Sequence, residues 1–253
     1  MSMVKEITLN DFFEKNKKLA LAFSGGTDSA YLMYMAKKAG VDISAYYVRS
    51  QFQPKFEQDD ARRLADELGC RLVCIDVDIL SNEDVASNPE NRCYYCKKTM
   101  FAAIVQAARS DGYEMIIDGT NASDQADDRP GMRALEEAMI CSPLRLCGIM
   151  KSDVRELSKA AGLWTWDKPS YACLATRIKT GERITEDSVE KVEANEEILR
   201  SMGYRDFRVR VSGDCAKLEL RGEDLEKGIR DREEIIKALN KTYSRVLLDP
   251  EEE

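Results

Sequence analysis

Ser24-Gly25-Gly26-Thr27-Asp28-Ser29 follows directly on the apolar run 19–23 and precedes a helical pattern that extends from Ser29 to Ala39. Glycine lets a backbone turn sharply and approach a ligand closely. The first turn of the following helix directs N–H groups without intrahelical partners, and the positive end of the helix dipole, toward that turn. The hydroxyl groups of Ser24, Thr27 and Ser29 add further donors, so the stretch predicts a phosphate-binding loop.

The loop differs from the Walker pattern, because no G-x-x-x-x-G-K-[ST] is present and no lysine follows the glycines. It resembles instead the pyrophosphate loop (PP-loop) of the ATP-pyrophosphatase superfamily, whose members activate a substrate by adenylylation. The alternative is an ordinary strand–turn–helix with a serine cap. Two glycines and three hydroxyls in six residues exceed what a turn needs.

The first part of the chain predicts alternating strands and helices. Apolar runs at 43–48, 72–77 and 115–117 indicate further strands, and 55–68 has an amphipathic helical pattern that Gly69 ends. This alternation predicts parallel strands joined by crossover helices. Ligands bind beyond the carboxyl ends of such strands. We therefore expect the turn 118–121, with Gly119 and Thr120, on the same edge as the glycine loop.

In the second part of the chain, the spacing of apolar residues changes from a helical pattern to the two-residue alternation of strands. We expect a helix from Ser152 to about Ala161, an irregular segment over 163–181, and a helix from the cap Thr185 to about Met202. Alternating runs around 212–214 predict a hairpin, followed by a helix over 225–239 and a strand over 244–248. The expected architecture is an α/β parallel-sheet domain over 1–165 followed by a small α+β domain over 166–253.

Composition narrows the class of protein. The chain has 253 residues and a net charge of −8, which disfavours general binding of nucleic acid. No apolar run approaches the ~20 residues that span a bilayer, and residues 1–6 lack a signal-peptide layout, so we expect a cytoplasmic protein. Histidine is absent. A general base must therefore be a carboxylate, Lys, Tyr, Cys or the substrate itself, and a metal must use Cys or oxygen ligands.

Three of the eight cysteines have settings that indicate function. Cys93 and Cys96 form a C-x-x-C pair, and Cys173 lies in a polar, irregular segment. A four-cysteine zinc site would need a second pair, which is absent. Three thiolates would bind three irons of a [4Fe–4S] cluster and leave one iron open to an extra sulfide, whereas standard clusters use four cysteines. The alternatives are a redox pair, a zinc half-site or incidental spacing.

Several charged residues are further candidates. Arg208 and Arg210 share one face of a strand and would suit a phosphate or carboxylate; the alternative is a solvated face paired to Glu219. Arg177 would lower the pKa of the Cys173 thiol and hold an anion. Other oxygen-ligand candidates are Glu219, Glu196 and Asp118.

Asp28 follows the glycine loop directly. We expect its carboxylate to bind Mg²⁺ together with the triphosphate of ATP. The alternative is a helix cap.

Motifs along nearly the whole chain are similar to those of the LarE family. They are Ser-Gly-Gly-Thr-Asp-Ser (24–29), Asn-Pro-x-Asn-Arg-Cys-Tyr-Tyr-Cys-Lys (88–97), Asp-Gly-Thr-Asn (118–121), Arg-Pro-Gly (129–131), Ser-Pro-Leu (142–144), Lys-Pro-x-x-Ala-Cys-Leu-Ala-Thr-Arg (168–177) and Arg-Val-Arg (208–210). The stretch 211–215 departs from the more basic, histidine-containing sequence of that family.

The resemblance implies an ATP-dependent sulfurtransferase in the synthesis of a nickel-pincer nucleotide cofactor. ATP adenylylates a carboxylate of pyridinium-3,5-biscarboxylic acid mononucleotide, and sulfur then displaces AMP. It implies that residues 24–29 bind ATP phosphates, that Arg208 and Arg210 bind the substrate phosphate near Cys173, and that Cys93, Cys96 and Cys173 hold a [4Fe–4S] cluster. It also implies a sulfur donor and a homo-oligomer, in the family often a hexamer.

Three rival hypotheses remain open on the residues alone. A tRNA thiolase can pair a PP-loop with three cysteines but needs a basic RNA surface. In an ammonia-using synthetase of the GMP or NAD type, the C-x-x-C pair would have no role in the reaction. A nucleotide-binding regulator stapled by zinc would release no pyrophosphate.

Overall fold

The computed structural model describes residues 7–124 and 129–250, which form two compact units. The first unit is built from segments 1–50, 55–77 and 93–168, and the second from 51–54, 78–92 and 169–253. The second unit therefore includes two short segments from the first half of the chain, which no local sequence pattern indicates. The predicted domain boundary between residues 165 and 166 stays a prediction.

A four-stranded parallel sheet with strand order β3-β2-β1-β4 forms the centre of the first unit. This confirms the predicted α/β class. The strands are β1 (Lys18–Ala22), β2 (Asp42–Arg49), β3 (Arg71–Asp76) and β4 (Ile116–Asp118). In the register of β1 and β4, Ala22 lies opposite Asp118, so both strands end at the same edge of the sheet.

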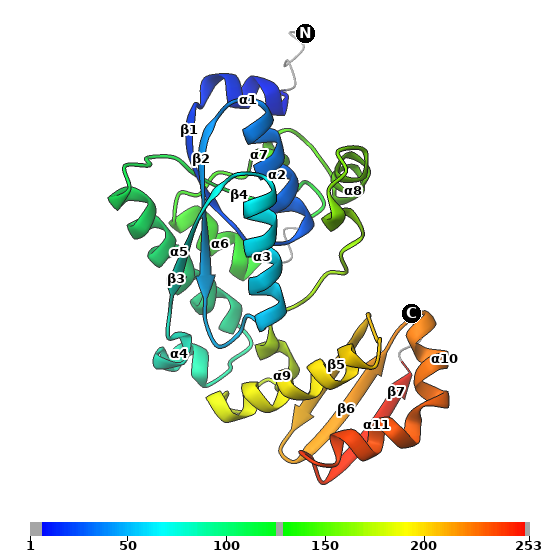
Figure 1. The fold of residues 1–253 in the computed structure, drawn as a ribbon. Helices are drawn as coiled ribbons and strands as arrows, with labels where there is room; N and C mark the ends of the chain where they lie inside the picture. The colour runs from blue at the N-terminus through cyan, green and yellow to red at the C-terminus, as the bar shows by residue number, and fades with distance from the viewer. Residues whose placement is uncertain (1–6, 125–128, 251–253) are drawn as a thin grey trace, which may run out of the picture. The chain divides into compact units, whose positions relative to one another are not determined.

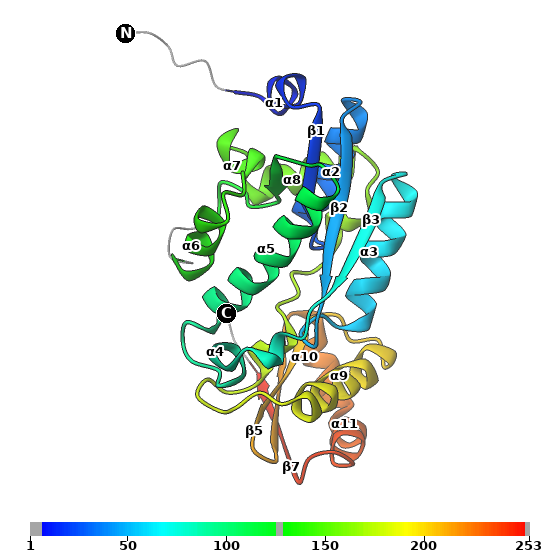
Figure 2. The same cartoon turned by 90° about the vertical axis from the view of Figure 1, so that its left-hand side faces the viewer.

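Helices cover both faces of this sheet (Figures 1 and 2). The core on one face involves α1 (Leu9–Lys15), α2 (Thr27–Lys38), α3 (Lys55–Glu67), α7 (Pro143–Leu146) and α8 (Lys151–Ala160); the other involves α5 (Arg92–Ser110) and α6 (Arg129–Glu137). The sheet separates these two cores. Successive side chains of β1 point to opposite faces of the sheet, so Leu19 and Leu21 pack into the first core and Ala20 packs into the second. Full burial of each leucine contributes roughly 1.5–3 kcal/mol.

Two helices of the first unit begin earlier than their sequence patterns predict. Helix α2 begins at Thr27, because Gly26 serves as its N-cap in an extended conformation. Helix α8 begins at Lys151, and the predicted cap Ser152 lies inside it. The N-cap is Met150, whose backbone N–H donates to the Asp153 carboxylate at 2.8 Å.

The second unit contains a three-stranded sheet of order β5-β6-β7. Strands β5 (Phe207–Ser212) and β6 (Cys215–Leu220) form the predicted antiparallel hairpin, and β7 (Arg245–Pro250) runs parallel to β6. Helix α9 (Glu186–Ser201) begins after the predicted cap Thr185.

The single helix predicted over 225–239 is wrong. Two helices, α10 (Glu223–Arg230) and α11 (Arg232–Leu239), meet at Asp231. Asp231 leaves helical geometry, and its carboxylate accepts a hydrogen bond from the Tyr204 hydroxyl at 2.9 Å. Aspartate favours helix ends because its side chain competes with helical hydrogen bonding.

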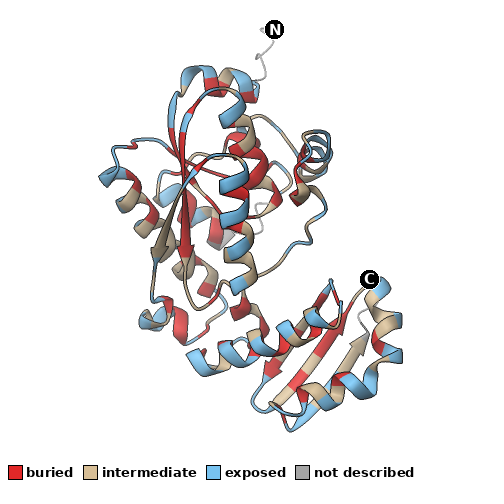
Figure 3. Ribbon diagram, viewed as in Figure 1, coloured by how far each residue is buried: buried red, intermediate tan, exposed pale blue. Residues whose placement is uncertain are grey.

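Alternation along β5 gives the small sheet a buried face and a polar face (Figure 3). Phe207, Val209 and Val211 are buried, whereas Arg208 and Arg210 are half-buried on the opposite face. The remaining short elements are η1 (Ile79–Ser81), α4 (Glu83–Ala86), η2 (Trp164–Asp167) and η3 (Leu174–Arg177). Within the described residues, none of the helices combines the length and apolar character needed to cross a bilayer.

Candidate functional site

The loop 24–29 lies at the carboxyl end of β1, immediately before α2. Gly25 has φ +73°, and a Cβ atom there would lie 3.1 Å from the Ala61 Cβ on α3. The hydroxyls of Ser24 and Ser29 lie 3.0 Å apart, and the Gly26 N–H donates to the Ser24 hydroxyl at 3.3 Å. The first turn of α2 therefore begins beside the paired hydroxyls of Ser24 and Ser29, an arrangement that suits phosphate oxygens.

The turn after β4 packs against the start of α2, at the edge where the sequence predicted it. A Cβ atom on Gly119 would lie only 2.8 Å from the Ser29 backbone nitrogen. Only glycine fits at this distance without a backbone shift, so Gly119 lets the two loops approach each other.

The two loops and α5 enclose a pocket of about 230 Å³. It is lined by Ala22, Ser24, Asp28, Ser29, Lys97, Phe101, Asp118, Gly119, Thr120, Asp124 and Leu135. The structure thus brings together five of the predicted nucleotide-binding residues, namely Ser24, Asp28, Ser29, Gly119 and Thr120. Gly25, Gly26 and Thr27 do not line this pocket, and the Thr27 hydroxyl donates to the Thr165 carbonyl at 2.8 Å.

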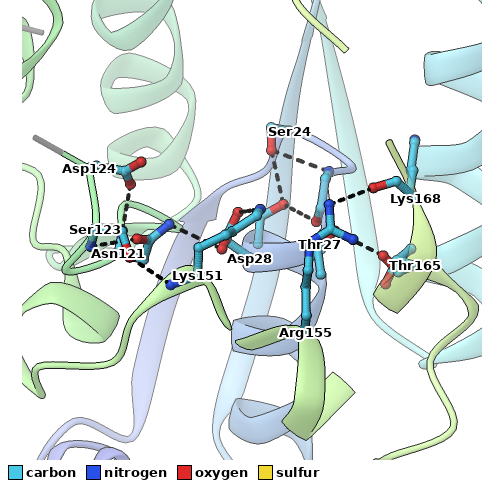
Figure 4. A network of polar contacts seen from close by, with 12 residues as sticks. Ser24, Thr27, Asp28, Asn121, Ser123, Asp124, Lys151, Arg155, Thr165 and Lys168 are labelled. Atoms are coloured by element: carbon cyan, nitrogen blue, oxygen red, sulfur yellow. Dashed lines mark hydrogen bonds and ion pairs between the residues drawn. The ribbon is translucent and has the colours of Figure 1, made fainter. Parts of the chain in front are cut away.

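Both carboxylate oxygens of Asp28 have partners from later parts of the chain (Figure 4). The Asn121 amide donates to Oδ1 at 3.2 Å, and the Lys151 ammonium pairs with Oδ2. The carboxylate is thereby held at the pocket, where its oxygens are ligands of the kind that Mg²⁺ prefers.

Asp118 is the buried carboxylate of the pocket. It accepts hydrogen bonds from the Ser142 hydroxyl at 2.6 Å and from the Thr120 hydroxyl. Burial raises the pKa of Asp118, and the two hydroxyls and the nearby Lys97 charge oppose that rise. Ser142 of the Ser-Pro-Leu motif therefore contributes to the pocket by holding the Asp118 carboxylate with a hydrogen bond. The side chains of Arg129 and Pro130 in the Arg-Pro-Gly motif lie outside the described residues.

The segment 165–168 ties the phosphate loop to two helices of the first unit (Figure 4). Thr165 accepts from Thr27, and the Lys168 ammonium donates to the Gly25 carbonyl at 3.4 Å. Lys168, with a side chain only 10% exposed, also forms ion pairs at 3.1 and 2.8 Å with two carboxylates of α3, those of Glu57 and Asp60. Arg155 on α8 donates to the backbone carbonyls of Trp166 and Lys168 at 2.7 and 3.1 Å.

The C-x-x-C pair lies in the first two turns of α5, a helix that lines the nucleotide pocket through Lys97 and Phe101. Lys97 and Phe101 follow Cys93 at intervals of four residues, so the three side chains share one face of the helix. The Cys96 Sγ lies 3.7 Å from the Met100 Sδ. A thiol thus lies one helical turn from a pocket-lining lysine.

Cys173 belongs to the second unit, where it is half-buried at the N-cap of η3. Arg177 ends that short helix, and its side chain is only 1% exposed. Its guanidinium pairs with Glu196 at 2.7 Å and donates to the Ala172 carbonyl at 3.1 Å. Burial opposes the charge of Arg177, but the hydrogen bond and charge of Glu196 raise its pKa.

Within the described residues, no three Cys, Asp or Glu side chains are grouped as a metal site. Cys93 and Cys96 belong to the first unit and Cys173 to the second. Their convergence stays a prediction.

Cations gather around a second pocket, which has a volume of about 480 Å³ in the second unit. It is lined by Thr176, Arg177, Ile178, Lys179, Thr180, Arg210, Val211, Ser212, Cys215, Lys217 and Leu247. The Arg210 guanidinium donates to Glu219 at 2.5 Å and to the Thr176 carbonyl at 2.9 Å.

The predicted partner of Arg210, Arg208, does not line this pocket. Its pKa is lowered by burial and by the positive charges of Arg221, Arg177 and Arg210. Crowded guanidinium groups of this kind favour an anion between them.

Three functional candidates were not assigned from the sequence. Lys97 directly follows the C-x-x-C pair, and Lys168 is the first residue of the motif around Cys173. Their positions in these motifs could have identified them as functional candidates from the sequence. Lys151 lies 123 residues from Asp28, and nothing in its neighbourhood indicates a role.

Comparison of the sequence with known proteins identifies relatives. A family model described as a PP-loop domain matches residues 1–155. The chain is 34% identical to the pyridinium-3,5-bisthiocarboxylic acid mononucleotide synthase of Lactiplantibacillus plantarum, over 85% of this chain and 79% of the relative. It is also 34% identical to an uncharacterized protein of Synechocystis, over 88% and 84% of the two chains. A tRNA-specific 2-thiouridylase of Clostridium botulinum is 27% identical over 59% of this chain and 52% of the relative.

Proposed function

The chain belongs to the PP-loop family and, within it, to the LarE family, and from this we propose that it is an ATP-dependent sulfurtransferase acting on pyridinium-3,5-biscarboxylic acid mononucleotide. The observation that carries the proposal is the composition of the nucleotide pocket. The loop 24–29, the carboxylates of Asp28 and Asp118, and the thiol-bearing helix α5 all meet there.

The first step is adenylylation of a substrate carboxylate. A carboxylate oxygen bonds to the α-phosphorus of ATP, the bond to the β-phosphate breaks, and pyrophosphate leaves. A carboxylate is already a nucleophile, so the step needs no general base, in agreement with a chain that has no histidine. The N–H groups at the start of α2 and the hydroxyls of Ser24 and Ser29 hold the phosphates.

Mg²⁺ fits this pocket by the chemistry of its donors. Asp28 would hold the ion, with Asp118 and Asp124 lining the same pocket. When bound, the ion neutralises phosphate charge.

The second step is sulfur transfer. A sulfur nucleophile at the oxidation level of hydrosulfide forms a C–S bond with the acyl carbon, the C–O bond to AMP breaks, and a thiocarboxylate results. A second round treats the other carboxylate. In this proposal Cys173 would be the thiol closest to the reaction, and the charge of Arg177, which interacts with Cys173, would stabilise its thiolate and a bound anion.

We further propose that Cys93, Cys96 and Cys173 hold a [4Fe–4S] cluster. The donor set fits, because thiolates are the ligands of such clusters and the first two lie three residues apart on one helix. Assembly requires the second unit to bring Cys173 to the other two thiols. When bound, a cluster with an open iron supplies the sulfur to be transferred.

The second pocket would hold the phosphate of the mononucleotide. Arg210 and Arg177 line it. Arg208 lies outside this lining, on the same face of β5 as Arg210, and a phosphate nearby would offset the neighbouring positive charges that help to lower its pKa. The partners we propose are a sulfur donor and other copies of the chain in a homo-oligomer, on the hexamer pattern of the family. The proposed location is the cytoplasm.

Pyrophosphate release measured against candidate substrates tests the function. We expect release with ATP and the pyridinium dicarboxylate mononucleotide, followed by a thiocarboxylate detected by mass spectrometry under anaerobic conditions. Release that depends on tRNA instead would favour a thiouridylase. Release with the mononucleotide that ends in an amide would indicate an ammonia-using synthetase, and nucleotide binding without release would indicate a regulator.

A further inference from the structure

The phosphate loop contains no positive charge of its own. Residues 24–29 carry one charged side chain, the Asp28 carboxylate. The leaving group of the proposed reaction is pyrophosphate, which concentrates negative charge as it departs. Stabilising such charge requires cations or donors placed in advance. In a Walker loop a lysine of the loop itself supplies that cation.

Lys151 brings a cation to this loop from α8. It is the first residue of that helix, and its backbone N–H donates to the Ser123 hydroxyl at 2.9 Å, which fixes its position beside the turn 118–124. Its ammonium group pairs with Asp28 Oδ2. Figure 4 shows the two side chains in contact. The Asp28 side chain is 20% exposed and that of Lys151 33%, so the pair is partly screened from solvent but can be reached.

The same Asp28 carboxylate is the proposed ligand of Mg²⁺. With Oδ1 held by Asn121 and Oδ2 held by Lys151, the carboxylate has its charge balanced before any metal arrives. A divalent ion that binds Oδ2 must displace the ammonium group or share the oxygen with it. The flexible four-carbon stem of lysine lets the ammonium move without moving α8.

We infer that Lys151 is the resident counter-ion of Asp28, which yields this carboxylate to Mg²⁺ when Mg·ATP binds and then contacts the pyrophosphate portion of the nucleotide. The inference rests on the proposed function, in which Asp28 is the metal ligand. It assigns Lys151 two effects of opposite sign. In the absence of nucleotide, Lys151 competes with a metal ion for Asp28; with ATP bound, it adds to the binding of the phosphates.

Metal binding without nucleotide tests the first effect. We expect Lys151→Met to raise the affinity of the nucleotide-free protein for Mn²⁺, measured by electron paramagnetic resonance, by about tenfold, because an uncompensated carboxylate attracts the ion more strongly. Lys151→Arg should keep the wild-type affinity. Lys159→Met removes an exposed lysine of the same helix and should also leave the affinity unchanged.

Pyrophosphate release tests the second effect. In Lys151→Met we expect the rate at saturating Mg·ATP to fall about 100-fold, the size of effect seen when one preorganised donor to a developing charge is removed. A merely structural role would lower both metal affinity and rate. Unchanged or weaker Mn²⁺ binding in Lys151→Met would overturn the inference, as would an unchanged rate.

Asp28→Asn separates this inference from the function on which it rests. We expect that variant to weaken binding of Mn·ATP. If it does so while Lys151→Met leaves nucleotide-free Mn²⁺ binding unchanged, only the role of Lys151 fails. If Asp28→Asn leaves Mn·ATP binding unchanged, the metal role of Asp28 and the inference fail together.

Discussion

At the scale of single residues, the buried Glu196 carboxylate has three partners, two of which lie in the segment that carries the predicted functional thiol Cys173. Its carboxylate accepts from the Arg177 guanidinium at 2.7 Å, from the Val209 backbone N–H at 3.1 Å, and from the Tyr171 hydroxyl. Tyr171 and Arg177 lie on either side of Cys173 in the sequence. Glu196 therefore holds both ends of the segment that carries the thiol, a positioning role instead of the ligand role considered from the sequence.

Glu196→Gln should lower the free energy of unfolding by about 3–5 kcal/mol, because it leaves the Arg177 charge buried without compensation. Arg177 and Glu196 are each only 1% exposed, so solvent does not screen the loss. Urea denaturation followed by circular dichroism measures the change. The matched control is Glu83→Gln, which removes the partner of Arg183 in an exposed pair. We expect no measurable change there, and equal effects from the two variants would contradict the argument.

At the scale of elements, the segment 86–92 joins the second unit through hydrogen bonds and not through a strand. Asn88 is fully buried with φ +56°, and its amide donates to the carbonyls of Lys179 and Glu182 at 2.9 and 3.1 Å. Arg92 donates to the Asn88 side-chain oxygen at 2.5 Å and to the Ala175 carbonyl at 3.1 Å. These bonds shape the segment 175–182, which contributes Thr176 to Thr180 to the cationic pocket.

Asn88→Gly and Asn88→Ala should both speed tryptic cleavage after Lys179 and Arg183, because each removes the bonds that hold the loop. Loss of a buried partner costs about 1–3 kcal/mol. Alanine should destabilise by a further ~1 kcal/mol, since it disfavours the left-handed backbone that glycine accepts. Time-resolved proteolysis and thermal unfolding measure the two contributions. Asn240→Ala at an exposed position is the control. Cleavage rates no faster than the control would show that the loop is held by other contacts.

Sequence patterns predicted the presence of helices and strands more accurately than the residues at which these elements begin and end. The hairpin of β5 and β6 was predictable because two alternating runs flank a short polar turn. The break at Asp231 was not, because Leu225, Ile229 and Ile236 keep apolar residues at helical spacings of four and seven across it. Asp231, which accepts a hydrogen bond from Tyr204, is the N-cap of α11, and the spacing of apolar residues does not predict a helix end at this position.

At the scale of the whole molecule, the proposed cluster draws its ligands from both compact units. Cys93 and Cys96 follow one segment of the second unit directly in the chain, and Cys173 lies five residues after Lys168, the last residue of the first. Each thiol is therefore close in sequence to a point where the chain passes from one unit to the other.

Anaerobic reconstitution should yield roughly four irons per chain, with matching sulfide, if the three thiols assemble a cluster. Cys173→Ala should lose iron and abolish sulfur delivery, while adenylylation, measured as pyrophosphate release, persists because the nucleotide pocket belongs to the first unit. Cys74→Ala on β3 is the control and should retain both. Iron, zinc and sulfide analysis measures the content. Stoichiometric zinc in place of iron would contradict the cluster, and loss of pyrophosphate release in Cys173→Ala would indicate a structural role for that thiol.

The local features of this protein can be predicted from its amino-acid sequence. The glycines and hydroxyls of 24–29 predict a phosphate loop because glycine conformation and helix-end hydrogen bonding are local properties. The alternation of apolar runs predicts the parallel sheet, and sheet topology then places Gly119 beside that loop.

The pairing of charges that are distant in the chain became known from the fold alone. Lys151 reaches Asp28, Lys168 reaches the Gly25 carbonyl, and Glu196 secures Arg177 across separations of 19 to 143 residues. Lysine and glutamate are common on any solvated surface, so their types and spacing carry little information. The choice of partner depends on how the helices pack on the sheets, and that packing sums many contacts from the entire chain.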